Sequence, residues 1–311
     1  MRNSMYSGKQ IFFNKKLLEY YKWTKEVKGI IKTEKPDVVH FLYGDVFYKY
    51  FGLGLEGLKK KHKVVNTIHA LKKGKIGIVS LKRIMHLSSV GVVHTDAIFN
   101  EVKDAGIENV VHIEYPHFST GYDIDKAGAR KYYGLSENAF VLGCIGGTRY
   151  DKGLDILLKA LQGVTGDFEL LVAGAEDAIK REKIEELARP YGDRVKLHLS
   201  FLTDEEFEMA IQAVDAIVLP YRKTFNGASG PLGEGVAKGK MIIAANHGSL
   251  GDIVEKNHLG YTFESENIEA LKKVLNMAIQ RTNYTYDEKA NVYKNKLSIN
   301  EFKKQYCKLY F

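Results

Sequence analysis

The stretch FVLGCIGGTRYDKGLDILLKAL, residues 140–161, decides the fold of this chain. It opens with an apolar run, turns at Gly146 and Gly147, and resumes with apolar residues at helical spacing. An apolar run that ends at glycines and leads into a helical pattern indicates a buried parallel strand, a tight turn and a covering helix. The turn also carries two cations, Arg149 and Lys152, beside backbone amides that a phosphate could approach.

The same alternation of apolar runs and helical patterns extends in both directions from this stretch. We expect strands at residues 38–42, 64–68, 90–94, 110–114, 140–145, 168–172, 195–199, 216–219, 241–245 and 259–263. Strands that alternate with helices at this interval are typical of βαβ units in a parallel sheet. The sequence therefore predicts an α/β fold with two Rossmann-like doubly wound domains and a cleft between them.

The expected domain boundary lies where the alternation lapses, between Pro116 and Asn138. We assign residues 1–137 to a first, shortened domain and residues 138–295 to a second. Residues 296–311 are expected to form a helix that packs back toward the first domain. An amphipathic helix at 14–32 is expected near the start of the chain, because its apolar residues recur at helical spacing.

Composition excludes several classes of protein. The chain of 311 residues is 45% hydrophobic and 27% charged, which is ordinary for a folded globular protein of two domains. It holds no long apolar segment of the kind that crosses a membrane or opens a secretory leader. Its two cysteines, Cys144 and Cys307, give neither a disulfide framework nor metal-ligand spacing.

The net surplus of positive charge lies in the first half of the chain. Residues 1–137 hold 23 Lys and Arg against 14 Asp and Glu. The whole chain holds 46 and 38, so residues 138–311 have 23 basic residues against 24 acidic ones. A half with this surplus attracts anionic surfaces. No aromatic RNA-binding motif, zinc finger or Arg-rich recognition helix is present, so nucleic acid is not the expected partner.

A second loop rich in small residues follows the expected strand at 216–219. Residues 225–235 read FNGASGPLGEG and lead into a helix. Small residues allow a ligand to approach the backbone closely. Glu234 lies about one turn into that helix, where its carboxylate can accept two hydrogen bonds from a ribose diol.

Three pieces in this order carry a family resemblance. The chain resembles the nucleotide-binding half of GT-B glycosyltransferases of the retaining family 4 type. The pieces that carry this resemblance are GGTRYDKGLDILLKAL (146–161), VDAIVLPYR (214–222) and SGPLGEGVAKGKMIIAANHGSLGDIV (229–254). The resemblance covers residues 139–280 well and 36–118 more loosely. It implies the GT-B fold and the activity of a glycosyltransferase.

The resemblance also implies roles for particular residues. Arg149 and Lys152 match the basic pair that holds the donor diphosphate and supports its departure, and Glu234 matches a glutamate that binds the ribose. Loop residues are expected to line the donor site or border its base: Gly146, Gly147, Gly174, Glu176, Ser229 and Gly230. His69, at the end of an expected strand, matches a histidine that contacts the donor sugar. The resemblance implies no metal or other cofactor.

Two departures from the family pattern stand out. Asn226 occupies the position of the family's first glutamate, eight residues before Glu234, and an amide can bind a sugar hydroxyl but cannot offset a positive charge on the sugar. We also expect the opening βαβ portion of the family, which faces the acceptor, to be missing or much shortened.

The expected function is a retaining transfer of a sugar from a nucleotide diphosphate donor, UDP being favoured, to a hydroxyl of a glycan or lipid-linked acceptor, as in bacterial-type surface polysaccharide or glycoconjugate synthesis. Two alternatives remain open. One is a non-catalytic nucleotide-sugar-binding partner of another transferase. The other is a GT-B-fold epimerase or hydrolase that acts on the nucleotide sugar itself.

The basic first half suggests where such a protein would work. The helical pattern at 76–85 places Lys82 and Arg83 among aliphatic residues, as in helices that lie at an anionic membrane surface. The expected location is cytoplasmic, with peripheral attachment to the inner face of the membrane.

Overall fold

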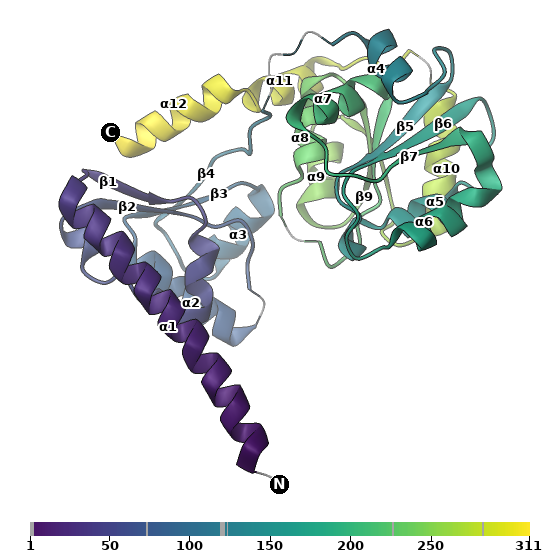
Figure 1. Cartoon of the computed structure of the whole chain (residues 1–311). Coiled ribbons are helices and arrows are strands. Elements are labelled where there is room, and N and C mark those ends of the chain that lie inside the picture. The colour runs from purple at the N-terminus through teal and green to yellow at the C-terminus, as the bar shows by residue number, and fades with distance from the viewer. Residues whose placement is uncertain (1–2, 73, 119–121, 123, 226, 282) are drawn as a thin grey trace. The chain divides into compact units, whose positions relative to one another are not determined.

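The structure is a computed structural model, and it describes residues 3–311 apart from 73, 119–121, 123, 226 and 282, with side chains from residue 16 onward. The chain forms two compact units, each with a parallel sheet of its own (Figure 1). The first unit comprises Met1–Val93, Ile98–His112 and Tyr310, and the second comprises His94–Ala97, Ile113–Leu309 and Phe311.

The first unit is built on a four-stranded parallel sheet in the order β1-β2-β3-β4. Its strands are β1 (Val38–Phe41), β2 (Lys63–Thr67), β3 (Val90–Val93) and β4 (Val110–His112). Its helices are α1 (Asn3–Glu34), η1 (Gly44–Tyr50), η2 (Leu58–Lys60), α2 (Lys75–Leu87) and α3 (Asp96–Asp104). Phe47, Leu55 and Ile84 join the strands in one core, which explains why the short helices η1 and η2 are held in place.

The second unit is built on a six-stranded parallel sheet in the order β10-β9-β8-β5-β6-β7. Its strands are β5 (Phe140–Ile145), β6 (Phe168–Ala173), β7 (Val195–His198), β8 (Ala216–Leu219), β9 (Met241–Ala245) and β10 (Gly260–Phe263). The central strands are buried on both faces, as parallel strands require.

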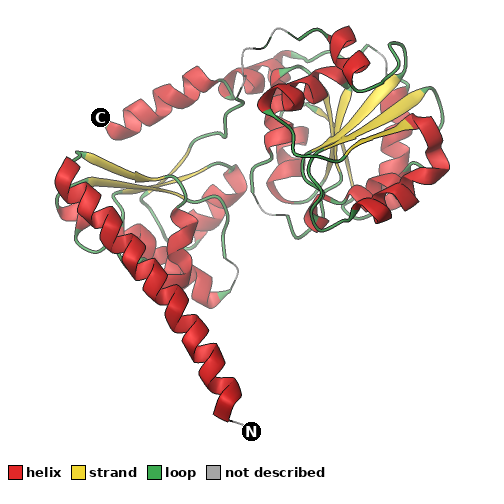
Figure 2. Ribbon diagram, viewed as in Figure 1, coloured by secondary structure: helices red, strands yellow, loops and turns green. Residues whose placement is uncertain are grey.

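Helices cover both faces of the six-stranded sheet (Figure 2). One face packs against α5 (Leu154–Ala160), α6 (Arg181–Ala188) and α10 (Ile268–Ile279). The other packs against α4 (Lys126–Tyr132), α7 (Asp204–Ala213), α8 (Gly230–Ala237), α9 (Gly248–Lys256) and α11 (Glu288–Lys296). Adjacent residues of β5 point to opposite cores, Leu142 to the first and Val141 to the second. The α/β class and the two parallel sheets are therefore as predicted.

The segment after β4 belongs to the second unit, whereas the sequence placed residues up to 137 in the first domain. Helix α4 packs on α7, and the buried guanidinium of Arg130 donates to the backbone oxygen of Ala213 at 3.0 Å and to the carboxylate of Asp215 at 2.7 Å. These bonds fasten the segment to the second unit. Packing of the last helix, α12 (Ile299–Tyr310), against the first domain stays a prediction.

Local signals in the sequence account for several helix ends. Thr203 caps α7 and forms a capping box with Glu206, as expected of a threonine at this position. Helix α1 begins well before residue 14.

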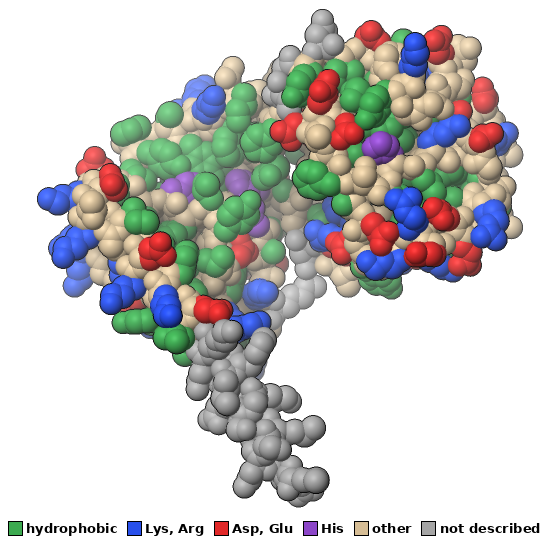
Figure 3. All heavy atoms as spheres, in the orientation of Figure 1, with side chains coloured by type: hydrophobic (Ala, Val, Ile, Leu, Met, Phe, Trp, Pro, Cys, Tyr) green, Lys and Arg blue, Asp and Glu red, His purple; other side chains and the backbone are tan. Residues whose placement is uncertain are grey.

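None of the helices in the described part of the chain combines the length and hydrophobicity of a membrane span. On the face drawn in Figure 3, Lys and Arg side chains lie along the outer margin of the first unit.

Candidate active site

The candidate site lies at the carboxyl edge of the six-stranded sheet, where its winding reverses. Strand β5 pairs with β6 on one side and with β8 on the other, so the loops that follow β5 and β8 leave the sheet side by side. The N–H of Arg222 donates to the backbone oxygen of Asp151 at 2.9 Å and joins these two loops directly. Ligands of open parallel sheets bind at this kind of switch point.

Two glycines allow the loops to approach this closely. Gly153 has φ +67°, and a Cβ there would lie 2.0 Å from the backbone oxygen of Pro220. Gly174 has φ +148°, and a Cβ there would lie 2.2 Å from the backbone oxygen of Gly146. Side chains cannot occupy these positions without moving the backbone. Gly146 and Gly174 thus pack directly together, and Gly147 lies near the backbone oxygen of Ala175.

Lys152 is the better enclosed of the two predicted cations. Its Nζ donates to the hydroxyl of Tyr221 at 2.7 Å and lies 3.9 Å from the centre of the Tyr221 ring and 4.6 Å from that of Phe225. Within the described part of the chain it pairs with no carboxylate. The pKa of Lys152 is lowered to about 8, mainly by burial and to a smaller extent by the positive charge of Arg149. The negative charge of Asp151 opposes this shift.

Arg149, from the same loop, has a different environment. Its guanidinium binds the carboxylate of Asp151 through two nitrogens, with 2.9 Å from Nε to Oδ1, and just over half of its side chain is exposed. The hydrogen bonds to Asp151 raise the pKa of Arg149. The loop therefore brings both cations together, but only Arg149 has an acidic partner among the described residues.

The N-terminus of α8 lies on the other side of Tyr221. Ser229 is the N-cap of this helix: its Oγ accepts from the N–H of Leu232 at 3.4 Å and lies 3.1 Å from the hydroxyl of Tyr221. Gly230 follows as the first helical residue. The backbone amides of a helix N-terminus favour an anion, so Lys152 and α8 present positive charge around one buried tyrosine.

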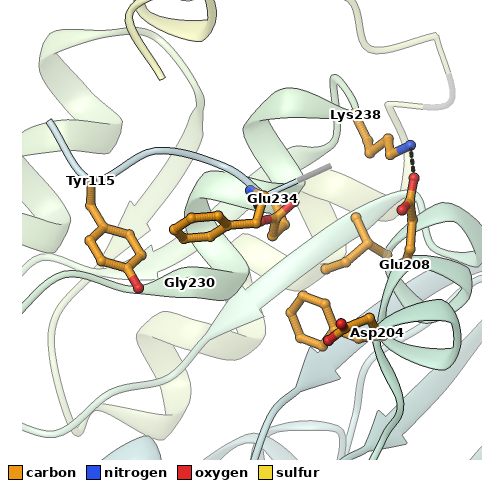
Figure 4. A pocket seen from close by; sticks show the side chains of 9 residues that line it. Tyr115, Asp204, Glu208, Gly230, Glu234 and Lys238 are labelled. Atoms are coloured by element: carbon orange, nitrogen blue, oxygen red, sulfur yellow. Dashed lines mark hydrogen bonds and ion pairs between the residues drawn. The ribbon is translucent and has the colours of Figure 1, made fainter. Parts of the chain in front are cut away.

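A pocket of about 440 Å³ opens beside α8 in the second unit (Figure 4). Aromatic, acidic and glycine residues line it together with one lysine and one isoleucine: Tyr115, Phe118, Asp204, Phe207, Glu208, Ile211, Gly230, Glu234 and Lys238. Glu234 Oε1 accepts the backbone N–H of Phe118 at 2.6 Å, and burial raises the pKa of this carboxyl. Lys238 points away from Glu234 and pairs with Glu208 at 2.5 Å, so these two acidic side chains of the pocket have different partners.

The other predicted site residues have surroundings of their own. Glu176 is exposed and pairs with Lys180 at 3.3 Å. His69 belongs to the first unit, where its Nε2 donates to the backbone oxygen of Leu42 at 2.8 Å and its ring stacks on Tyr43. Asn226 lies outside the described residues. Among the described residues, no three His, Cys, Asp or Glu side chains gather as metal ligands would.

Two features of the site escaped the sequence analysis. Tyr221 was part of a recognised motif but had no role, although its place directly after Pro220 at a strand end could have suggested one. Phe118 is 116 residues from Glu234 in the chain, and only the fold brings its N–H to that carboxylate.

Comparisons with known proteins agree with this architecture. Residues 139–281 match the family model described as glycosyl transferases group 1. A glycogen synthase of Xanthomonas axonopodis is 28% identical over 170 residues, which are 53% of this chain and 35% of that enzyme. A glycogen synthase of Rhodopseudomonas palustris is 25% identical over 236 residues, covering 70% of this chain and 45% of that enzyme. The chain thus spans less than half the length of these relatives.

Solved structures resemble the whole chain. A sucrose-phosphate synthase from Thermosynechococcus elongatus superposes with a TM-score of 0.76 at 18% identity, over 93% of this chain and 76% of that one. The Anabaena protein HepE, solved in complex with UDP, superposes with a TM-score of 0.71 at 17% identity, over 91% of this chain and 80% of that one. The chain therefore has the GT-B fold, and its residues 139–281 are similar to the glycosyl transferases group 1 family.

Proposed function

We propose that this protein is a glycosyltransferase that moves a sugar from a nucleotide diphosphate donor to a hydroxyl group, with retention of the anomeric configuration. The family match of the second unit supports the transfer activity. The observation that carries the proposal is Lys152, an enclosed ammonium group without an acidic partner among the described residues, next to the N-terminus of α8. Such a site favours a strong anion.

In this reaction the bond between the anomeric carbon and the diphosphate oxygen breaks, and a bond from the acceptor oxygen to that carbon forms. The acceptor hydroxyl releases its proton to the solvent, and the nucleotide diphosphate leaves with the electron pair of the broken bond and one added negative charge. Arg149, Lys152 and the first amides of α8 would stabilise that charge. Stabilising charge that develops in the transition state lowers the barrier by several kcal/mol (about 3–4 kcal/mol for one good donor).

Glu234 would bind the donor ribose through the carboxylate oxygen that faces the pocket. Its other oxygen is held by the N–H of Phe118, which fixes the carboxylate beside the aromatic wall that Tyr115, Phe118 and Phe207 supply. A ring-lined pocket of about 440 Å³ suits a nucleoside. The remaining residues that we propose for the donor site are His69, Gly146, Gly147, Gly174, Glu176, Asn226, Ser229 and Gly230.

We also propose a donor base and a class of acceptor. We favour uridine, since HepE was solved with UDP, although a starch synthase IV of the same fold was solved with ADP. The acceptor would be a glycan or a lipid-linked sugar, as in surface polysaccharide or glycoconjugate synthesis. We also propose that the first unit docks on an anionic membrane from the cytoplasmic side through α2, where Ile76 and Val79 are 74% and 57% exposed beside Lys82 and Arg83.

The test is release of the nucleotide diphosphate from UDP-sugars and ADP-sugars, measured with and without glycan or lipid-linked acceptors. Acceptor-dependent release with a retained anomeric bond supports the proposal. Donor binding without release would favour a non-catalytic partner of another transferase. Turnover that needs no acceptor would favour an epimerase or hydrolase.

A further inference from the structure

The hydroxyl of Tyr221 stands between the two positive elements of the site. It lies 2.7 Å from Lys152 Nζ on one side and 3.1 Å from the Oγ of Ser229, the N-cap of α8, on the other. Tyr221 is buried, with 2% of its surface exposed, so neither contact competes with bulk water. Its ring packs on Phe225 with 4.5 Å between centroids, which limits its movement.

The chemistry of the ammonium group fixes the direction of the first hydrogen bond. An ammonium group only donates, so the Tyr221 oxygen accepts from Lys152. Burial raises the pKa of Tyr221, so the phenol keeps its proton, and its hydroxyl shares a hydrogen bond with the hydroxyl of Ser229 in which either oxygen can be the donor. Ser229 Oγ also accepts the N–H of Leu232 from the first turn of α8. The chain of hydrogen bonds runs without a break from Lys152 to the helix N-terminus.

We propose that Tyr221 is a positioning residue for the donor diphosphate, because its hydroxyl joins the Lys152 ammonium and the α8 N-terminus in one hydrogen-bonded unit. This inference rests on the proposed function, since it concerns the site that would hold the diphosphate. Tyr221 itself need not touch the donor. It keeps Lys152 directed toward the helix and is the hydrogen-bond acceptor of the buried ammonium among the described residues.

The surroundings of Lys152 show why this acceptor matters. Charged and titratable groups face it from its own loop (Arg149, Asp151), from β5 (Cys144) and from the loop after β8 (Tyr221). Asp151 is already bound to Arg149, and the thiol of Cys144 stays neutral because burial raises its pKa to about 12. Within the described part of the chain, the phenol oxygen is thus the hydrogen-bond acceptor that favours the charged form of Lys152.

Tyr221→Phe tests this role, since it keeps the ring contacts and removes only the hydroxyl. Loss of the acceptor should lower the pKa of Lys152 further, by about half to one pH unit. The control is Tyr191→Phe, which removes a comparable bond of 2.7 Å to the backbone oxygen of Leu158. Protonation of Lys152 is measured by competitive acetylation across pH 6–10 and mass spectrometry, which needs no turnover.

The expected result is a midpoint for Lys152 acetylation that moves to lower pH in Tyr221→Phe and stays in place in Tyr191→Phe. The alkaline fall of kcat/KM should move in parallel. A midpoint that is unchanged or higher in Tyr221→Phe would overturn the inference, even if kcat decreases. If the wild type binds no nucleotide diphosphate, the proposed function fails separately, and the acetylation midpoint still decides whether Tyr221 controls Lys152.

Discussion

Arg222 binds both carboxylate oxygens of Asp155, at 2.9 and 2.7 Å, and thereby fastens the loop after β8 to the start of α5. The same guanidinium lies 3.8 Å over the ring of Tyr150 and donates to the backbone oxygen of that residue. It is almost fully buried, with 8% of its side chain exposed. Arg222 therefore adds a buried ion pair to the hydrogen bond of Lys152 with Tyr221, and both join the two loops.

Arg222→Ala should destabilise the second unit strongly, because it leaves the Asp155 carboxylate without its partner. We expect a loss of about 3–5 kcal/mol in the free energy of unfolding, measured by urea denaturation. Arg83→Ala is the control, since its ion pair with Glu56 spans 3.6 Å and is exposed, and it should cost less than about 1 kcal/mol. Equal small losses for both variants would contradict this account.

Gly153→Ala should be more harmful than the conformation of that glycine alone explains. Gly134 has a similar φ of +65° but open space around its Cβ position, so Gly134→Ala reports the cost of the left-handed backbone alone, about 1 kcal/mol. Gly153→Ala adds a clash with the Pro220 oxygen and should shift the two loops. Thermal unfolding of both variants measures the difference, and similar values would show that the loops do not meet as described.

Glu234→Gln should change how stability depends on pH. Burial raises the pKa of Glu234, so the folded state holds its proton more tightly than the unfolded chain. The contribution of this group to stability is therefore complete at low pH and is lost as pH rises through its folded pKa. The wild type should lose stability relative to Glu234→Gln as the pH rises above the ordinary pKa of a glutamate, about 4.3.

Urea denaturation of both proteins across this pH range measures that difference. The exposed Glu182 on α6 offers a control, Glu182→Gln, for which the difference from wild type should stay constant with pH. A constant difference for Glu234→Gln as well would mean that its carboxylate is not desolvated in the folded protein.

The proposed membrane contact makes a separate prediction. Ile76→Ser combined with Val79→Ser removes exposed apolar surface from α2 without changing charge, and each side chain would contribute about 1.5 kcal/mol or more when inserted. Flotation with anionic vesicles should show at least tenfold weaker binding. Met277→Ser, an exposed position on α10 of the second unit, should have no effect. Undiminished flotation of the double variant would remove α2 as the contact.

The sequence predicted the sheets well because buried parallel strands are apolar on both faces. The strands β5, β8 and β9 were predicted with their observed bounds, since glycine, proline or polar residues end each run. The short helices η1 and η2 were not predicted, because apolar residues do not recur at a regular period in residues 44–60. This segment is ordered by the packing of Phe47 and Leu55 in the core.

The site was predictable where a residue lies in a motif, and not where two loops meet. Arg149, Lys152 and Glu234 are local features of a strand end or a helix start. The contact of Lys152 with Tyr221 joins positions 69 residues apart, and it depends on the order of β5 and β8 in the sheet. No periodicity along the chain contains that information.

The central claim is that the cations after β5 hold the diphosphate of a nucleotide. Calorimetric titration of UDP tests this claim most directly. The proteins to compare are the wild type, Lys152→Ala and the control Lys159→Ala, which changes an exposed lysine. We predict that Lys152→Ala weakens binding at least tenfold, as loss of a charge-assisted bond should (about 1.5–3 kcal/mol), and that Lys159→Ala binds like the wild type. Wild-type affinity in Lys152→Ala would contradict the account.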